Sequence, residues 1–143
     1  MRPLVFLAVA VPAVGLLACN NPRSGAGFRL PAGDPERGKA AFVDLKCHEC
    51  HRVAGVDFPA PTVEPPVPVV LGGEVPHVKT DGELFTSIVN PSHKIALGYR
   101  PELVERDGKS RMPDFSDVMT VRQMMDLVAF LQARYRVVRP GQP

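Results

Sequence analysis

Two cysteines and a histidine stand at a spacing that suits attachment of a metal-containing cofactor. Residues 47–51 read Cys-His-Glu-Cys-His, so that Cys47 and Cys50 are three positions apart and His51 follows at once. Thiols at this spacing on a nascent helical turn point the same way, and both can add to the vinyl groups of a haem. The histidine is then held below the iron, where a ring nitrogen can coordinate it. The run therefore predicts one covalently bound c-type haem, with iron as its metal.

Two other kinds of site could use the same residues. In an oxidising compartment, a bare Cys-x-x-Cys pair would be expected to close into a disulfide or to act as a thiol oxidoreductase. That chemistry belongs to thioredoxin-like folds, whose alternating βαβ pattern is not evident in this sequence. Zinc is disfavoured because adjacent cysteine and histidine positions suit a tetrahedral site poorly, and no second ligand pair lies at finger-like spacing. Haem attachment is the favoured interpretation.

A haem held through one histidine has a second axial position, and Met112 is the favoured candidate to fill it. This methionine lies in a polar stretch, residues 110–115, with no apolar periodicity that would explain it as packing. Met119, Met124 and Met125 lie in or beside an amphipathic segment, where methionine ordinarily fills a core. The predicted metal ligands are therefore His51 and Met112. The identity of the axial ligands is the main control on the redox potential of a haem.

The other histidines and an open position are the alternatives for that site. His48 lies inside the attachment run and would point away from the iron, whereas His77 and His93 lie in expected surface loops. Either loop histidine could be the ligand if its loop folded over the haem. An open or displaceable position would instead suit a haem-based sensor or ligand-binding domain, which is the alternative function.

The N-terminus has the features of an export signal. Arg2 precedes an apolar run, residues 4–17, that is too short to span a membrane and ends in small residues before Cys19. Residues 1–18 are therefore expected to be a lipoprotein signal peptide, with diacylated Cys19 as the lipid anchor. An ordinary secretory peptide or an uncleaved anchor is the alternative, and each version exports the domain. The residue after Cys19 is Asn20, and not the aspartate that marks inner-membrane retention in some bacteria. The anchor could therefore lie in the inner or the outer membrane.

Size and charge limit the remaining possibilities. The 143 residues are 45% hydrophobic, which is enough for one compact domain with its own core. The net charge is +2, and removal of residues 1–18 takes away one basic side chain to leave +1. A nearly neutral chain without tryptophan lacks the basic stripe that nucleic-acid binding requires. Nucleic acid is therefore excluded as a partner.

Capping signals and apolar periodicity predict three helices. Each begins after a side chain that can accept from the first turn, and two also have a capping box. The expected helices run from Pro35 towards Lys46 with N-cap Asp34, from Thr80 with Glu83 to a stop at Asn90, and onward from Thr120 with Gln123. The last has apolar residues at helical spacing, namely Met124, Leu127, Val128, Leu131 and Tyr135.

The segments between these helices are expected to be irregular. Residues 20–31 contain Gly, Pro, Ser and Asn without periodicity and predict a flexible tether. Residues 59–76 include six prolines, which exclude regular helix and predict an extended loop. Residues 93–111 are polar, with a turn signal at Asp107-Gly108. The sequence shows no internal repeat and no strong strand alternation.

Taken in order, four elements of the sequence resemble class I cytochromes c. They are Gly-Asp-Pro-Glu-Arg-Gly at 33–38 with Phe42, the Cys-x-x-Cys-His run at 47–51, Met-Pro-Asp-Phe at 112–115, and Leu-Val-Ala-Phe-Leu at 127–131. The resemblance covers residues 33–137. The order and spacing of four separate elements are far more specific than any one of them.

The resemblance implies an all-α fold in which three to four helices and long irregular loops wrap one covalently bound haem. Cys47 and Cys50 would hold the porphyrin, His51 would be the proximal ligand and Met112 the distal ligand. The first and last helices would cross at Gly38, Phe42, Leu127 and Phe130. The chain would divide into signal peptide (1–18), tether (19–32), cytochrome c domain (33–137) and C-terminal tail (138–143).

One departure from the family concerns the partner of the proximal histidine. Family members commonly place Gly-Pro, then Leu and Gly, after the haem site, and the proline carbonyl accepts from the proximal imidazole. Residues 65–72 here read Pro-Pro-Val-Pro-Val-Val-Leu-Gly, without the leading glycine and with extra residues. Either Pro66 or Pro68 would have that role.

These inferences predict an electron carrier rather than an enzyme, with no catalytic residue. An iron with two protein ligands does not readily bind substrate or dioxygen, so it is limited to gaining and losing one electron. The expected setting is an exported, membrane-tethered respiratory or related electron-transport chain, with the domain facing the periplasm or the outer cell surface. The expected partners are a redox protein donor and acceptor that dock transiently at the exposed haem edge.

Overall fold

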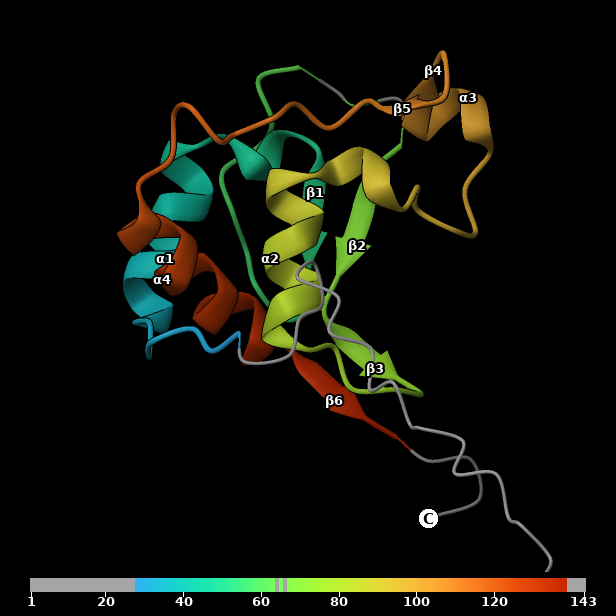
Figure 1. Cartoon of the computed structure of the whole chain (residues 1–143). Coiled ribbons are helices and arrows are strands. Elements are labelled where there is room, and N and C mark those ends of the chain that lie inside the picture. Colours follow the sequence, from blue (N-terminus) through green and yellow to red (C-terminus); the bar gives the residue numbers. More distant parts are fainter. Residues whose placement is uncertain (1–27, 64, 66, 139–143) are drawn as a thin grey trace, which may run out of the picture.

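The fold is built around a crossing between the first and last helices (Figure 1). The computed structural model describes residues 28–63, 65 and 67–138. Helix α1 spans Pro35–Asp44 and helix α4 spans Val121–Gln132. They meet at Gly38, where an added Cβ would overlap the carbonyl oxygen of Asp126 and lie 2.6 Å from Cβ of Phe130. The expected crossing at Gly38 and Phe130 is therefore confirmed.

Helix α1 begins and ends for local reasons. The Asp34 carboxylate accepts hydrogen bonds from the backbone N–H groups of Glu36 and Arg37, at 2.9 and 3.1 Å, as the expected N-cap. The helix ends at Asp44, because Lys46 adopts a left-handed backbone conformation with φ of 59°. That turn leads into the short 3₁₀ helix η1, Cys47–Glu49.

Helix α2 spans Asp81–Val89 and confirms its predicted capping box. The Thr80 hydroxyl accepts from the Glu83 N–H, and the Glu83 carboxylate accepts from the Thr80 N–H. The helix stops before Asn90, as expected from Pro91, which opens the 3₁₀ helix η2, Pro91–His93. Its buried face packs against α4.

Helix α4 has the predicted capping box but is shorter than predicted. The Thr120 hydroxyl accepts from the Gln123 N–H, and the Gln123 side chain accepts from the Thr120 N–H. Tyr135, expected as the last apolar residue of this helix, lies instead in strand β6, Tyr135–Val137. Strand β6 pairs in parallel with β3, Gly73–Val75. The helical spacing of Tyr135 was therefore misleading, because strand pairing takes over after Gln132.

A second parallel pair joins the attachment segment to the proline-rich loop. Strand β1, His51–Val53, pairs with β2, Val69–Leu71, so that His51 lies opposite Val69. The sequence predicted neither pair, because strands of three residues show no alternation to detect. These short strands are additions to a fold that is otherwise mostly helical, as expected.

The stretch expected to be irregular, 93–111, contains regular elements. Helix α3, Pro101–Val104, leads into a hairpin of β4, Glu105–Arg106, and β5, Lys109–Ser110. The predicted turn at Asp107-Gly108 closes this hairpin, with φ of 52° and 73°. Figure 1 shows this group at the opposite end of the molecule from the α1–α4 crossing.

The core lies between α1, α4 and α2. Phe42 and Phe130 are its largest fully buried side chains, and Phe58 stacks on Phe42 with 5.0 Å between ring centroids. The other buried residues of this cluster are Ala41, Val53, Leu84, Met124, Leu127, Val128 and Leu131. Phe42 and Leu127 are thus both buried near the crossing, as expected.

The described chain begins inside the segment expected to be a tether. Phe28 contacts Phe85 of α2 edge to face, with 5.3 Å between ring centroids, and Leu30 packs against the core. The expected signal peptide, the lipid anchor Cys19 and most of the tail lie outside the described residues. Among residues 28–63, 65 and 67–138, no helix has the length and hydropathy needed to cross a membrane.

Candidate functional site

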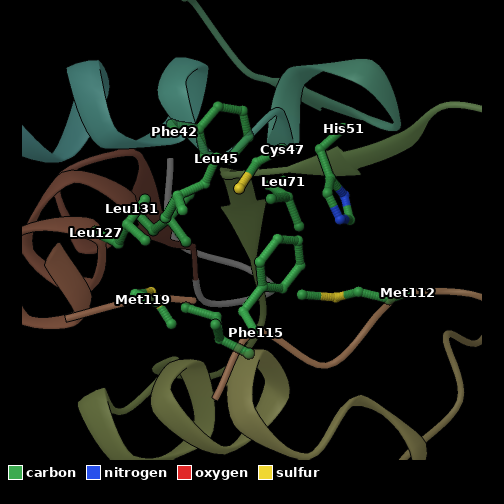
Figure 2. Close-up of a pocket in the computed structure, with 11 residues that line it drawn as sticks. Phe42, Leu45, Cys47, His51, Leu71, Met112, Phe115, Met119, Leu127 and Leu131 are labelled. Carbon is green, nitrogen blue, oxygen red and sulfur yellow. The ribbon is translucent and has the colours of Figure 1, made fainter. Parts of the chain in front are cut away.

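An apolar pocket opens between the helices and the loop that follows β5 (Figure 2). All of its lining residues are apolar except Cys47 and His51. The lining consists of Phe42, Leu45, Cys47, His51, Leu71, Ile88, Met112, Phe115, Met119, Leu127 and Leu131. The pocket therefore brings together three of the predicted cofactor residues, Cys47, His51 and Met112, in an apolar environment.

Cys47 is the first residue of η1, Cys50 follows its last residue, and the two cysteines differ in exposure. Cys47 lines the pocket, and Figure 2 shows its sulfur directed into it. Burial raises the pKa of the Cys47 thiol to about 11, so that the group is neutral at physiological pH. Cys50 is exposed and does not line the pocket, and the two cysteines form no disulfide. The thiols are thus both available for thioether bonds.

His51 is held by the parallel pairing of β1 with β2. Its Nδ1–H donates a long hydrogen bond, 3.4 Å, to the carbonyl oxygen of Val69. Because Nδ1 carries the proton, Nε2 keeps the lone pair that a metal ligand needs. Burial lowers the pKa of His51, which favours the same neutral form.

The acceptor for His51 corrects an expectation from the sequence. We expected the carbonyl of Pro66 or Pro68, and the structure places Val69 in that role. The reason is the strand register, which sets Val69 directly opposite His51 and also bonds the Val69 N–H to the Cys50 carbonyl. Pro66 lies outside the described residues, and Pro68 is exposed.

Met112 reaches the pocket from a loop without regular structure. Its backbone N–H donates to the Ser110 hydroxyl at 3.1 Å, and its side chain extends into the pocket beside Phe115 (Figure 2). Met119 also lines the pocket, whereas Met124 and Met125 are buried in α4. Met119 was interpreted from the sequence only as core filler. Because Met119 directly precedes the final helix, no signal in the sequence indicated that it lines the pocket. The turn that follows Phe115 brings it to the pocket wall.

The alternative histidine ligands lie away from the pocket. His77 and His93 are exposed, and His48 is buried beside Phe58, with 6.4 Å between ring centroids. None of the three lines the pocket. Across the described residues, no group of three or more His, Cys, Asp or Glu side chains is arranged so that it could hold a metal ion.

The residues of the pocket fit a covalently bound haem. The apolar lining suits a macrocycle, Cys47 offers a thiol at its wall, and His51 offers one unprotonated ring nitrogen. Phe42 links this wall to the core, since it contacts the pocket and lies 5.8 Å from the Phe130 ring centroid. The helix crossing therefore supports one side of the site directly.

The comparison with known proteins agrees with this chemistry. The family model described as Cytochrome c matches residues 35–134, which is well over half of the chain. The chain therefore belongs to the cytochrome c family. No curated protein and no solved structure matches it.

Membership of this family gives the site its general meaning. The family binds haem c covalently, and the matched region contains the run at 47–51 as well as Met112. Its members are haem-based electron carriers that exchange electrons with redox protein partners. The fold is that of a cytochrome c, with four helices among the described residues and small strands between them.

Proposed function

We propose that this protein is a one-electron carrier whose single haem has His51 and Met112 as axial ligands. The observation that carries the proposal is that both side chains line one apolar pocket together with Cys47. The other histidines lie outside this pocket, which favours a thioether over a second imidazole. Of the two methionines in the lining, Met112 is the one in the Met-Pro-Asp-Phe element of the family resemblance.

The chain's own residues prepare the site for this role. When bound, haem c supplies an iron that takes up and releases a single electron. Val69 holds the His51 ring in one tautomer and orientation, which keeps Nε2 available as a ligand. Phe42, Leu127 and Leu131 exclude water from one wall, and a low dielectric there favours the less charged ferrous state.

We further propose that the domain is exported and tethered to a membrane through lipidated Cys19. The support comes from the sequence, where Arg2, a short apolar run and small residues precede that cysteine. Two or more acyl chains would anchor the protein stably, and the domain would face the periplasm or the outer cell surface. Its partners would be redox proteins that dock weakly and leave quickly, which permits turnover.

Mature protein from an exporting host tests the haem attachment and the function together. Intact-mass analysis should show one haem added to the polypeptide, and a denaturing gel stained for haem should keep the signal. Cys47→Ser should lose most of this attachment, whereas Ser87→Ala, a change at an exposed position on α2, should keep it.

Carbon monoxide then separates the carrier from a haem sensor. The ferrous spectrum should be low-spin and unchanged by the gas, because Met112 fills the sixth position. Ready formation of a carbonyl complex would favour the sensor, and a mass without haem would contradict the proposal altogether.

A further inference from the structure

The loop that holds Met112 has little packing of its own. Residues 111–120 form no helix or strand, and most of them are exposed. A ligand on such a loop needs other restraints, because a mobile side chain loses conformational entropy on each binding event. The residues just before Met112 supply those restraints.

Arg111 bonds to three backbone carbonyls of one short segment. Its backbone N–H donates to the Val104 carbonyl at 2.9 Å. Its guanidinium donates from Nη2 to the Glu102 carbonyl at 3.1 Å and from Nε to the Glu105 carbonyl at 3.3 Å. These carbonyls lie at the end of α3 and the start of β4, where helical partners are lacking.

Ser110 forms hydrogen bonds both with Met112 and with the segment that follows α2. Its hydroxyl accepts from the Met112 N–H at 3.1 Å, and its own N–H donates to the Ser92 hydroxyl at 3.1 Å. Ser92 belongs to η2, which follows directly on α2. A continuous path of hydrogen bonds therefore leads from η2 to the backbone of Met112. Val104, the last residue of α3, accepts from the Arg111 N–H and is buried.

The side-chain contacts of Arg111 depend on the planar geometry of its guanidinium group and not on pairing with an opposite charge. Within the described chain, its guanidinium forms no ion pair, and its acceptors are neutral carbonyls. The planar fork of an arginine can reach two carbonyls at once, and a lysine ammonium is a point charge on a flexible stem. Arg106, on the same hairpin, is exposed and forms no side-chain hydrogen bond with described residues.

We propose that the β4–β5 hairpin is a clamp for Met112, with Arg111 and Ser110 as its positioning residues. Arg111 fixes the end of the hairpin to α3, and Ser110 fixes the backbone of Met112 to the hairpin. The thioether then stays directed into the pocket without a helix behind it. This inference rests on the proposed function, since it requires Met112 as the axial ligand.

Imidazole, which competes with a methionine for ferric haem, probes the clamp. We compare Arg111→Lys and Ser110→Ala with the matched control Arg106→Lys, which also keeps its charge. Arg111→Lys should bind imidazole about ten-fold more tightly than the parent and Ser110→Ala about three-fold, as expected for lost hydrogen bonds of ordinary strength. Arg106→Lys should match the parent. All should keep covalent haem and the helical circular dichroism of the parent.

Amide hydrogen exchange gives a second readout that does not depend on electron transfer. In Arg111→Lys, the backbone amides of residue 111 and Met112 should exchange faster than the same amides in Arg106→Lys. The exchange rates of the α4 amides should be the same in both variants. A purely structural role for Arg111 would instead lower the protection of α4 as well. If Arg111→Lys fails to mature, Ser110→Ala decides the outcome by the same measurements.

The failure of the clamp differs from a failure of the proposed function. Equal imidazole affinity in Arg111→Lys, Ser110→Ala and the control would overturn the clamp and leave the ligand assignment standing. The reference variant Met112→Ala tests that assignment. If it keeps the parental imidazole affinity and the red absorption band of a methionine-ligated ferric haem, Met112 is not the ligand and both proposals fall.

Discussion

The two sides of the pocket are built in different ways. On the His51 side, α1 and α4 cross at Gly38 with their backbones in contact, and Phe42 carries that packing to the pocket wall. On the Met112 side, an exposed hairpin is held by hydrogen bonds from Arg111 and Ser110. Buried apolar contacts stabilise the first side, and exposed polar contacts stabilise the second.

This difference indicates which side of the pocket can open locally. A region with few buried contacts opens at a lower free energy than the core, so the Met112 side should open while the helix crossing stays intact. The covalent side of the site is thus rigid, and the other side can adjust. Changes at the crossing should therefore affect the whole domain, and changes at the hairpin should affect ligation alone.

The largest effect is expected at the helix crossing. Gly38→Ala would place a Cβ against the Asp126 carbonyl and Phe130, so the helices must move apart, at a cost of about 3 kcal/mol or more in the free energy of unfolding. Gly82→Ala is the matched control, since it lies in α2 and its Cβ would meet nothing closer than 3.9 Å. It should be neutral or stabilise by about 0.5–1 kcal/mol, as alanine usually does in a helix.

Urea unfolding of Gly38→Ala and Gly82→Ala, both with haem attached, measures the two free energies of unfolding. Similar stabilities for Gly38→Ala and Gly82→Ala would contradict the close backbone contact at the crossing. A lower yield of Gly38→Ala with normal Gly82→Ala points the same way as the expected destabilisation.

A smaller, pH-dependent effect is expected at Asp126. This buried carboxylate accepts from Arg37 Nε at 2.9 Å and from the Asp34 N–H at 2.7 Å, which ties the start of α1 to α4. The hydrogen bond from Arg37 and that from Asp34 lower its pKa, and the charges of Arg37 and Arg122 add to this. Because the folded pKa lies below the unfolded value of about 3.9, the stabilisation is complete above that pH and disappears as pH falls through the folded pKa.

Asp126→Asn should therefore destabilise the domain by a constant amount at neutral pH and by less in acid. Denaturant unfolding at a series of pH values measures the difference from the parent. Asp117→Asn, at an exposed aspartate that forms no hydrogen bond with described residues, is the control and should track the parent throughout. A difference that grows as pH falls would contradict the account.

The smallest effect is a difference in local opening within the unmodified protein. The amides of Phe130 and Leu131 should exchange only through global unfolding, since both residues are buried in α4. The Arg111 amide, bonded to the Val104 carbonyl on an exposed hairpin, should exchange through local opening that denaturant barely changes. Equal denaturant dependence at both places would show that the two sides of the site open together.

The parts of the fold that the sequence predicts are those with a local cause. The caps at Asp34, Thr80 and Thr120 were visible because each capping side chain and the backbone N–H group that donates to it are two or three residues apart. These signals do not depend on the rest of the chain.

The parts that it missed depend on contacts between distant segments. The pairing of β3 with β6 draws Tyr135 out of the helical pattern, and the pairing of β1 with β2 selects Val69 as the partner of His51. Phe58 and Met119 reach their places through turns, so no periodicity marks them. Strands of two or three residues leave no local pattern that a sequence analysis could use.

The most direct test compares the two methionines of the pocket in the ferric protein. Met112→Ala removes the proposed ligand, and Met119→Leu removes the other thioether while keeping an apolar side chain of similar size. The red absorption band of thioether-ligated ferric haem should vanish in Met112→Ala, with a fall in redox potential, and should persist in Met119→Leu. A band that survives in Met112→Ala and disappears in Met119→Leu would contradict the assignment of the site.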